Sequence, residues 1–149
     1  MRKIKTTFLS FVISIITLGI GYAETLEITY DTDTPIAGFQ FNVDGATVDA
    51  PSGCSGGAAG DAGFMVSCSA TTVLGFSLTG GTIPAGEGVL VVLDIEGDLD
   101  AACIIDVLLS DSAGEAIDNT VVDCINIEEN VGGCMDETAC NYNENANVD

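Results

Sequence analysis

The absence of positive charge constrains this chain more than any motif it contains. After Lys5 the sequence has no lysine, arginine or histidine, and all 23 acidic residues lie beyond that point. No salt bridge can form between side chains in that part, so its carboxylates must be satisfied by backbone N–H groups, water, salt or bound metal ions. Salt relieves the repulsion among them. The composition predicts a protein suited to salty or calcium-containing surroundings, or one whose charge simply provides solubility.

The three basic residues belong to a segment with the features of a secretory signal peptide. They precede an apolar stretch, Phe8 to Ile20, and Gly21-Tyr22-Ala23 offers small residues at a cleavage site. The apolar stretch is shorter than the roughly 20 residues that span a bilayer core. We therefore expect a signal peptide over residues 1–23, cleavage after Ala23, and a secreted or cell-surface protein.

Cysteine usage agrees with export. All six cysteines lie beyond residue 23, and the chain has neither histidines nor a Cys-x-x-Cys pair that would favour zinc. Proximity favours pairing Cys54 with Cys68 and Cys103 with Cys124, although six cysteines allow 15 connectivities and the sequence does not choose among them. The disulfide candidates are Cys54, Cys68, Cys103, Cys124, Cys134 and Cys140.

The same composition excludes several classes of function. Nucleic acids, anionic membranes and phosphorylated substrates are recognised by lysine and arginine, which the exported part lacks. Ser-His-Asp, Cys-His and Ser-Lys enzymes need an imidazole or an amine. Paired carboxylates remain chemically available, but the chain has no Asp-Thr-Gly or Asp-Ser-Gly motif and no tryptophan. We therefore expect a protein that is not an enzyme, with Phe39, Phe41, Phe64 and Phe76 in its core.

Apolar residues recur with a period of two along most of the exported chain, as in half-buried strands. Gly88–Glu96 is apolar on both faces, which is typical of a central strand in a sheet covered on both sides. Short strands at intervals of about ten residues favour an all-β fold, a β-sandwich over residues 24–130. Pro51–Gly63 is expected to be a long loop. The other expected strands are Leu26–Tyr30, Phe39–Val43, Phe64–Cys68, Leu74–Leu78, Cys103–Leu109 and Thr120–Ile127.

Three segments carry a resemblance to a known family. Ile36–Val43, Thr72–Ser77 and Ile83–Leu90 follow one another in an order that resembles the cohesin-like jelly-roll domains of secreted bacterial proteins, over about Leu26 to Glu128. The resemblance implies a jelly-roll β-sandwich. It also implies a docking function, because cohesins of the cellulosome type bind a calcium-loaded dockerin module on one sheet face. The resemblance assigns no contact residue.

The C-terminal segment, residues 131–149, differs in character. The run from Gly133 to Asn143, Gly-Cys-Met-Asp-Glu-Thr-Ala-Cys-Asn-Tyr-Asn, resembles a short cysteine-containing repeat in the tails of secreted marine-type bacterial proteins. That repeat is similar to the calcium-binding type 3 repeats of thrombospondin. The resemblance therefore implies a partial calcium-binding repeat.

The residue types of this tail support the same prediction. Oxygen-bearing side chains occupy every second position from Asn141 to Asp149, and calcium takes six to eight oxygen ligands. Mostly neutral ligands imply low affinity, in the range of about 0.1 to 1 mM. An asparagine-rich linker is the alternative. The predicted calcium ligands are Asp136, Asn141, Asn143, Asn145 and Asp149.

Two other acidic groups are better explained without a metal. Asp94, Glu96, Asp98 and Asp100 alternate where the apolar strand ends, and we expect a solvated strand end. Asp31 and Asp33 precede Pro35, which favours an Asx-type turn.

These features favour a non-catalytic, exported adhesion or scaffolding module with weak calcium binding in its C-terminal repeat. Its partner would be a protein or glycan at the cell surface. One alternative is a carbohydrate-binding module, for which Tyr30 and Tyr142 are the available aromatic candidates. Another is a structural subunit of a surface layer or extracellular fibre that associates with itself.

Overall fold

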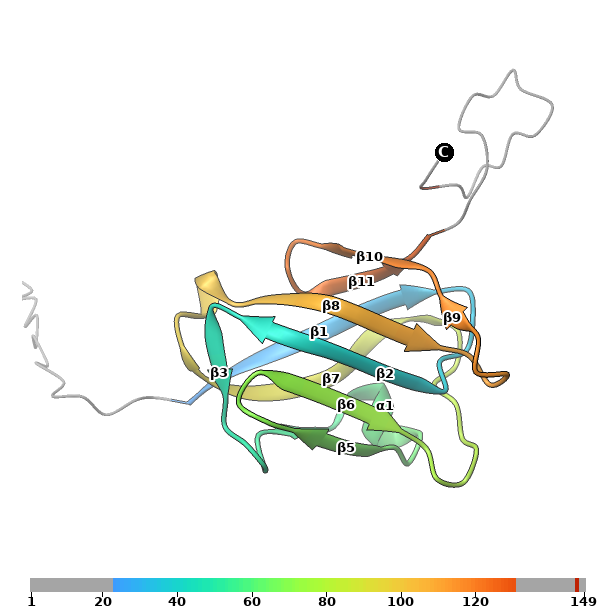
Figure 1. Ribbon diagram of the computed structural model, residues 1–149, viewed down its shortest axis with the longest axis horizontal. Coiled ribbons are helices and arrows are strands. Elements are labelled where there is room, and N and C mark those ends of the chain that lie inside the picture. Colours follow the sequence, from blue (N-terminus) through green and yellow to red (C-terminus); the bar gives the residue numbers. More distant parts are fainter. Residues whose placement is uncertain (1–22, 131–146, 148–149) are drawn as a thin grey trace, which may run out of the picture.

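The two-residue alternation of the sequence produces two facing β-sheets in the computed structural model, which describes residues 23–130 and 147 (Figure 1). The back sheet has the order β10-β11-β1-β7-β3, with β4 also paired to β7, and the front sheet has the order β5-β6-β2-β8-β9. The back strands are β1 (Glu24–Thr32), β3 (Ala46–Val48), β4 (Cys54–Ser55), β7 (Gly86–Gly97), β10 (Asn119–Val122) and β11 (Asn126–Glu129). The front strands are β2 (Gly38–Asp44), β5 (Met65–Cys68), β6 (Thr72–Phe76), β8 (Cys103–Ser110) and β9 (Ala116–Ile117).

This architecture confirms the expected all-β sandwich, and most expected strands are present. One was wrong, because Thr120–Ile127 is a hairpin of β10 and β11 and not a single strand. Asp123 and Cys124 between them have φ angles of 49° and 66°, in the left-handed region where the chain reverses. As a result β11 turns back and pairs in parallel with β1.

The strand β7 lies in the middle of the back sheet, as its apolar sequence predicted. It pairs with β1 on one side and with β3 and β4 on the other, and Leu90, Val91, Leu93 and Ile95 have no exposed surface. The expected loop Pro51–Gly63 contains more structure than predicted, namely β4 and the one-turn helix α1 (Gly57–Asp61). Ala59 of α1 is fully buried, and α1 packs against β7.

Aromatic side chains fill the space between the sheets. The Phe39 ring stacks against Phe41 and Phe64, with centroid distances of 6.1 and 6.2 Å. These three phenylalanines are buried as expected, but Phe76 is 36% exposed, so its placement in the core was wrong. Apart from α1 and the 3-10 turn η1 (Leu99–Ala101), the described residues contain no helix. None within this range has the length and apolar character that spanning a membrane requires.

Candidate functional site

The disulfide pairs favoured by proximity are both present. Cys54 is bonded to Cys68, with Cα atoms 6.2 Å apart, and Cys103 to Cys124, with Cα atoms 4.4 Å apart. Each bond connects the two sheets: Cys54 is in β4 and Cys68 in β5, while Cys103 is in β8 and Cys124 lies between β10 and β11. The two sheets are therefore covalently linked to each other at two places.

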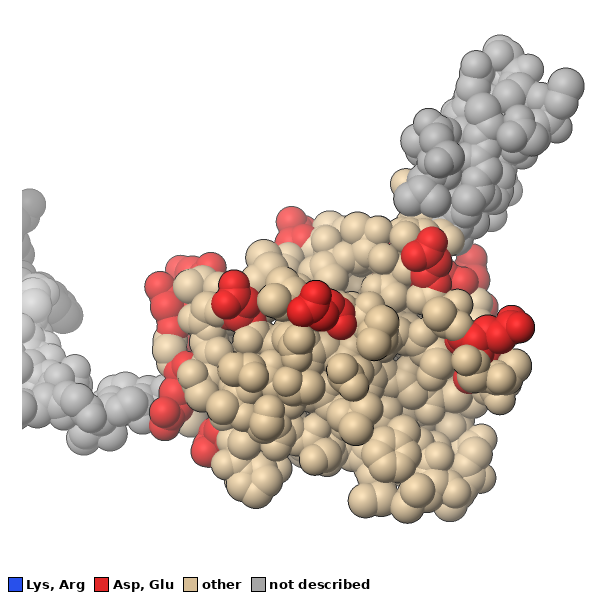
Figure 2. Space-filling view, in the orientation of Figure 1, with Lys and Arg blue, Asp and Glu red and all other residues tan. Residues whose placement is uncertain are grey.

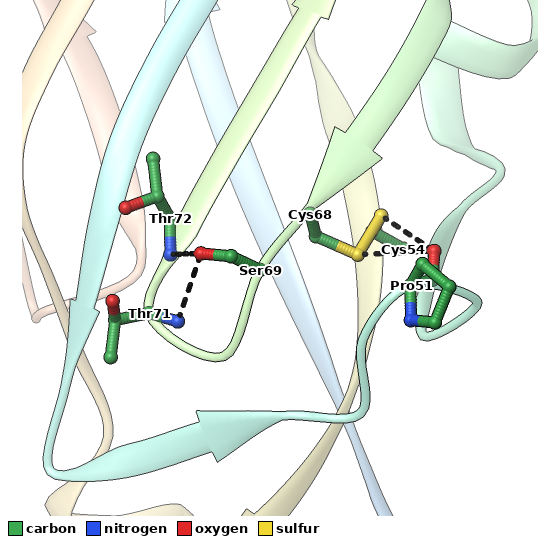
Figure 3. Close-up of a disulfide and its surroundings, with 6 residues drawn as sticks. All are labelled: Pro51, Cys54, Cys68, Ser69, Thr71 and Thr72. Carbon is green, nitrogen blue, oxygen red and sulfur yellow. Dashed lines mark hydrogen bonds between the residues drawn. A yellow bond between two sulfur atoms is a disulfide. The ribbon is translucent and has the colours of Figure 1, made fainter.

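Figure 3 shows how the first disulfide is surrounded. The Pro51 carbonyl oxygen lies 3.6 Å from Cys68 Sγ. Directly after Cys68, the Ser69 hydroxyl accepts hydrogen bonds from the backbone N–H groups of Thr71 and Thr72, at 3.4 and 3.1 Å. These contacts shape the turn from β5 to β6, and we assign them a structural role.

The predicted calcium ligands cannot be placed. Asp136, Asn141, Asn143, Asn145 and Asp149, and the cysteines Cys134 and Cys140, lie outside the described residues. Within residues 23–130 and 147, no group of three or more metal-ligating side chains gathers around a common point. Calcium binding by the tail stays a prediction.

The acidic run at the end of β7 and just beyond it behaves as expected. Asp94, Glu96, Asp98 and Asp100 are exposed, and the Asp98 carboxylate accepts a hydrogen bond from the Asp100 N–H at 3.0 Å. The Asx-type turn expected around Asp31 and Asp33 was wrong. The structure has a turn made by a threonine hydroxyl, in which Thr32 Oγ1 accepts from the Thr34 N–H at 3.0 Å.

The feature that the sequence did not predict is an apolar patch on the outer face of the front sheet. The inward and outward residues predicted for β6 were wrong: Val73 and Gly75 point inward, whereas Leu74 and Phe76 point to solvent. The inward position of Gly75 has a clear cause, because the Phe39 ring occupies the space that a Cβ atom at residue 75 would need. Leu74 and Phe76 are 39% and 36% exposed.

A bulge in β8 adds two more apolar side chains to this face. On β2 the pairing advances by two residues, from Gln40 to Asn42, while on β8 it advances by three, from Leu108 to Ile105. The extra residue places Ile105 and Leu108 on the same face, although residues three apart in a regular strand point to opposite faces. Asp106 within the bulge has a φ of 54°. Bulges of this kind re-aim side chains and are frequent next to functional sites.

Three of these side chains, those of Leu74, Phe76 and Leu108, line an open groove of about 420 Å³. Across the front sheet, Gly38 of β2 pairs with Phe76 of β6 on one side and with Ser110 of β8 on the other. The middle residue of this cross-strand row therefore has no side chain. In the next row, Gln40 lies between Leu74 and Leu108. We call the outer surface formed by Met65, Leu74, Phe76, Ile105 and Leu108, with the groove over Gly38, the apolar face.

Carboxylates border the apolar face but do not enter its middle. In Figure 2 the acidic side chains lie over β8 and at the two ends of the molecule, and a continuous uncharged surface covers β2, β6 and β5. At one end are Asp44 and Asp106, whose carboxylate accepts a hydrogen bond from Asn42 Nδ2 at 3.0 Å. At the other end are Asp111 and Glu115 of the β8–β9 turn, where Asp111 Oδ1 accepts from the N–H groups of Ala113 and Glu115. An uncharged apolar surface with an acidic border is thus built into a strongly acidic chain.

Comparison with known proteins gives no match. Neither a family model, nor a curated protein, nor a solved structure matches this chain. A function must therefore be inferred from the surface itself.

Of the two aromatic candidates for carbohydrate binding, Tyr30 does not contribute to such a surface. Tyr30 is only 6% exposed, burial raises the pKa of its phenol, and its hydroxyl donates a hydrogen bond to the Pro84 carbonyl oxygen at 3.4 Å. Tyr142 lies outside the described residues. Exposed tyrosine or tryptophan is the usual platform for a sugar ring, and Tyr30 cannot provide one here.

Proposed function

We propose that this chain is an exported, non-catalytic adhesion or scaffolding module that binds a protein at the cell surface through the apolar face. The main support for this proposal is an exposed apolar surface on one sheet of a chain with 23 acidic residues. Its exposed side chains include Leu74, Phe76, Ile105 and Leu108. Contiguous exposed apolar surface bordered by polar residues commonly marks a protein interaction site. Solubility alone would favour polar residues at these positions.

Two further observations support the proposal. The two disulfides suit an oxidising compartment, in agreement with the signal peptide predicted over residues 1–23. The exported part has no imidazole or amine side chain for nucleophilic or acid–base catalysis near neutral pH. Docking on a sheet face is also what the cohesin-like resemblance implies, and the proposal includes weak calcium binding by the C-terminal repeat.

The test compares two leucines that differ in position. The chain, exported in a bacterial host so that its disulfides form, is labelled and applied to cells of the organism that encodes it. Leu108→Asp places a charge on the apolar face, whereas Leu99→Asp makes the same change at an exposed leucine in η1. We expect Leu108→Asp to lower cell binding by about tenfold or more, as for a central interface residue, and Leu99→Asp to leave it unchanged.

Other outcomes would identify other functions. Unchanged binding by Leu108→Asp would show that cells do not contact the apolar face, and equal loss in both variants would show that an added negative charge alone weakens binding. Binding to a glycan array, or retained cell binding only where surface glycans remain intact, would favour a carbohydrate-binding module. Concentration-dependent assembly of the chain alone would favour a structural subunit.

A further inference from the structure

We infer that the partner of the apolar face is a cationic, amphipathic polypeptide segment: one large apolar side chain enters the groove over Gly38, and lysine or arginine side chains contact the acidic border. This inference rests on the proposed function and specifies the chemistry of the partner. It combines the shape of the groove with the charge distribution around it.

The groove determines the central contact. Its floor is open because Gly38 lies between Phe76 and Ser110 and carries no side chain. Its walls include Leu74 and Leu108, and its volume of about 420 Å³ is enough for one or two apolar side chains. Removing such apolar surface from water is favourable. A partner that presents leucine, methionine or an aromatic residue here would bury the most exposed leucine of the front-sheet strands, Leu108, which is 62% exposed.

The border determines the flanking contacts. Asp106 and Asp111 are held in place by hydrogen bonds, from Asn42 Nδ2 and from the β8–β9 turn respectively. No lysine or arginine is available within the chain beyond Lys5 to neutralise them. Cations of a partner therefore find preoriented carboxylates at both ends of the apolar face, and the field of the remaining acidic residues steers such a partner toward the molecule.

The same charges disfavour a second copy of the chain as the occupant. Two apolar faces brought together would place only carboxylates along the shared border, because no basic residue follows Lys5. Like charges opposed across an interface are unfavourable, and the Debye length of about 8 Å at physiological salt does not screen direct contacts. Charge complementarity therefore selects a basic partner.

The experiment uses three short peptides of equal length as probes: alternating leucine and lysine, alternating leucine and glutamate, and alternating serine and lysine. Each is titrated into the isotopically labelled chain at near-physiological salt, and backbone amide shifts are followed by NMR. We expect saturable binding of the leucine–lysine peptide, with shift changes concentrated on β2, β6 and β8. The other two peptides should bind at least about tenfold more weakly, because the leucine–glutamate peptide lacks the cations and the serine–lysine peptide lacks the apolar side chains.

Three variants separate the contribution of the apolar contact from that of the charged contacts. Leu108→Asp should weaken binding of the leucine–lysine peptide by about tenfold or more, and Leu99→Asp should not. Asp106→Asn should weaken it by about threefold, as expected for an exposed charge pair. Asparagine is the matched replacement because it tolerates the left-handed φ of 54° at this position and keeps an oxygen for the Asn42 amide.

The outcomes separate this inference from the proposed function. If the leucine–glutamate peptide binds as tightly as the leucine–lysine peptide, the cationic requirement is overturned and docking on the apolar face stands. If the serine–lysine peptide binds equally well, charge alone explains the binding and the inference is overturned. Shift changes confined to the back sheet, or no saturable binding of the leucine–lysine peptide, also overturn it, and the cell-binding comparison then decides the proposed function independently.

Discussion

At the scale of single residues, the Glu129 carboxylate shows how a chain with no lysine, arginine or histidine beyond Lys5 satisfies a partly buried charge. Its oxygens accept hydrogen bonds from the hydroxyls of Thr32 and Thr34, at 2.6 and 2.8 Å, and from the N–H groups of Asp33 and Thr34, at 2.8 and 2.9 Å. Burial on its own raises the pKa of Glu129, but these four bonds outweigh it and hold the pKa below the ordinary value of 4.5. The end of β11 is thereby attached to the loop that follows β1.

Replacing Glu129 by glutamine tests this attachment. A lowered pKa in the folded state means that the carboxylate stabilises the fold above pH 4.5, and that this contribution disappears as the pH falls through the lowered value. We expect Glu129→Gln to reduce the free energy of unfolding by about 1 kcal/mol at neutral pH, since the site is partly exposed and the amide keeps one acceptor oxygen.

Urea unfolding at several pH values measures the difference, which should shrink toward zero in acid. Glu115→Gln, at an exposed position in the β8–β9 turn, controls for the loss of one negative charge. A difference that stays constant down to low pH would contradict the role given to the charged form.

Gly75 illustrates a residue whose role the sequence did not reveal. In a strand, alanine is ordinarily more stabilising than glycine by about 0.5–1 kcal/mol. Here an added Cβ atom would overlap the Phe39 ring, which is 2% exposed and stacked between two other phenylalanines. We therefore expect Gly75→Ala to destabilise the fold by about 2 kcal/mol in urea unfolding, because overpacking a filled core outweighs the backbone effect. Gly60→Ala, where nothing lies within 4 Å of the added atom, should be neutral or slightly stabilising.

At the scale of elements, alternation predicted most strands correctly but failed where a local contact reverses the pattern. For β1 and β2, the apolar positions of the sequence are the buried ones. For β6, apolar residues lie on both faces, and the choice of Gly75 as the inward residue depends on Phe39, which is far away in the sequence. The bulge in β8 was likewise invisible, because consecutive apolar pairs such as Ile104-Ile105 fit either phase. The candidate site was therefore missed: it consists of the apolar residues that the sequence assigned to the core or left unassigned.

The two disulfides should contribute measurably to the free energy of unfolding. Each closes a loop, with sequence separations of 14 and 21 residues, and each connects the front and back sheets. Cys103→Ala with Cys124→Ala should lower the free energy of unfolding by about 3 kcal/mol, chiefly because the unfolded chain gains freedom. Cys54→Ala with Cys68→Ala should have a similar effect. Alanine at both Cys134 and Cys140 controls for the loss of two sulfur atoms, and a cost below about 1 kcal/mol for either sheet-connecting pair would contradict this account.

At the scale of the whole molecule, Asn147 of the C-terminal segment contacts the end of the sandwich. Asn147 Nδ2 donates a hydrogen bond to the Glu129 carbonyl oxygen at 2.8 Å. If the tail binds calcium as its oxygen-rich sequence predicts, binding should therefore raise the unfolding midpoint of the sandwich. An excess of 10 to 100 times a dissociation constant stabilises the bound state by about 1.4 to 2.7 kcal/mol.

Thermal unfolding with calcium, with magnesium at equal ionic strength, and with chelator measures this coupling. We expect calcium to raise the midpoint more than magnesium does, and the difference to vanish in a chain carrying Asp136→Ala and Asp149→Ala. Equal effects of both ions in both chains would mean that the cations act only by screening the carboxylates.

The whole molecule also separates its surfaces by charge. The acidic residues lie around the sandwich and its ends, and the front sheet keeps an uncharged middle (Figure 2). Such a division gives solubility and leaves one surface on which an apolar contact can form. We propose that the chain meets its partner on this surface.

Site-specific photo-crosslinking on cells tests this docking role. A benzophenone amino acid is placed at Leu108 in one chain and at Leu99 in another, both exported and applied to cells of the encoding organism before illumination. We expect a discrete protein adduct from position 108 that Asp106→Asn weakens, and none from position 99. The same adduct from both positions, or an adduct only between copies of the chain, would contradict the assignment of the apolar face as the docking surface for a basic partner.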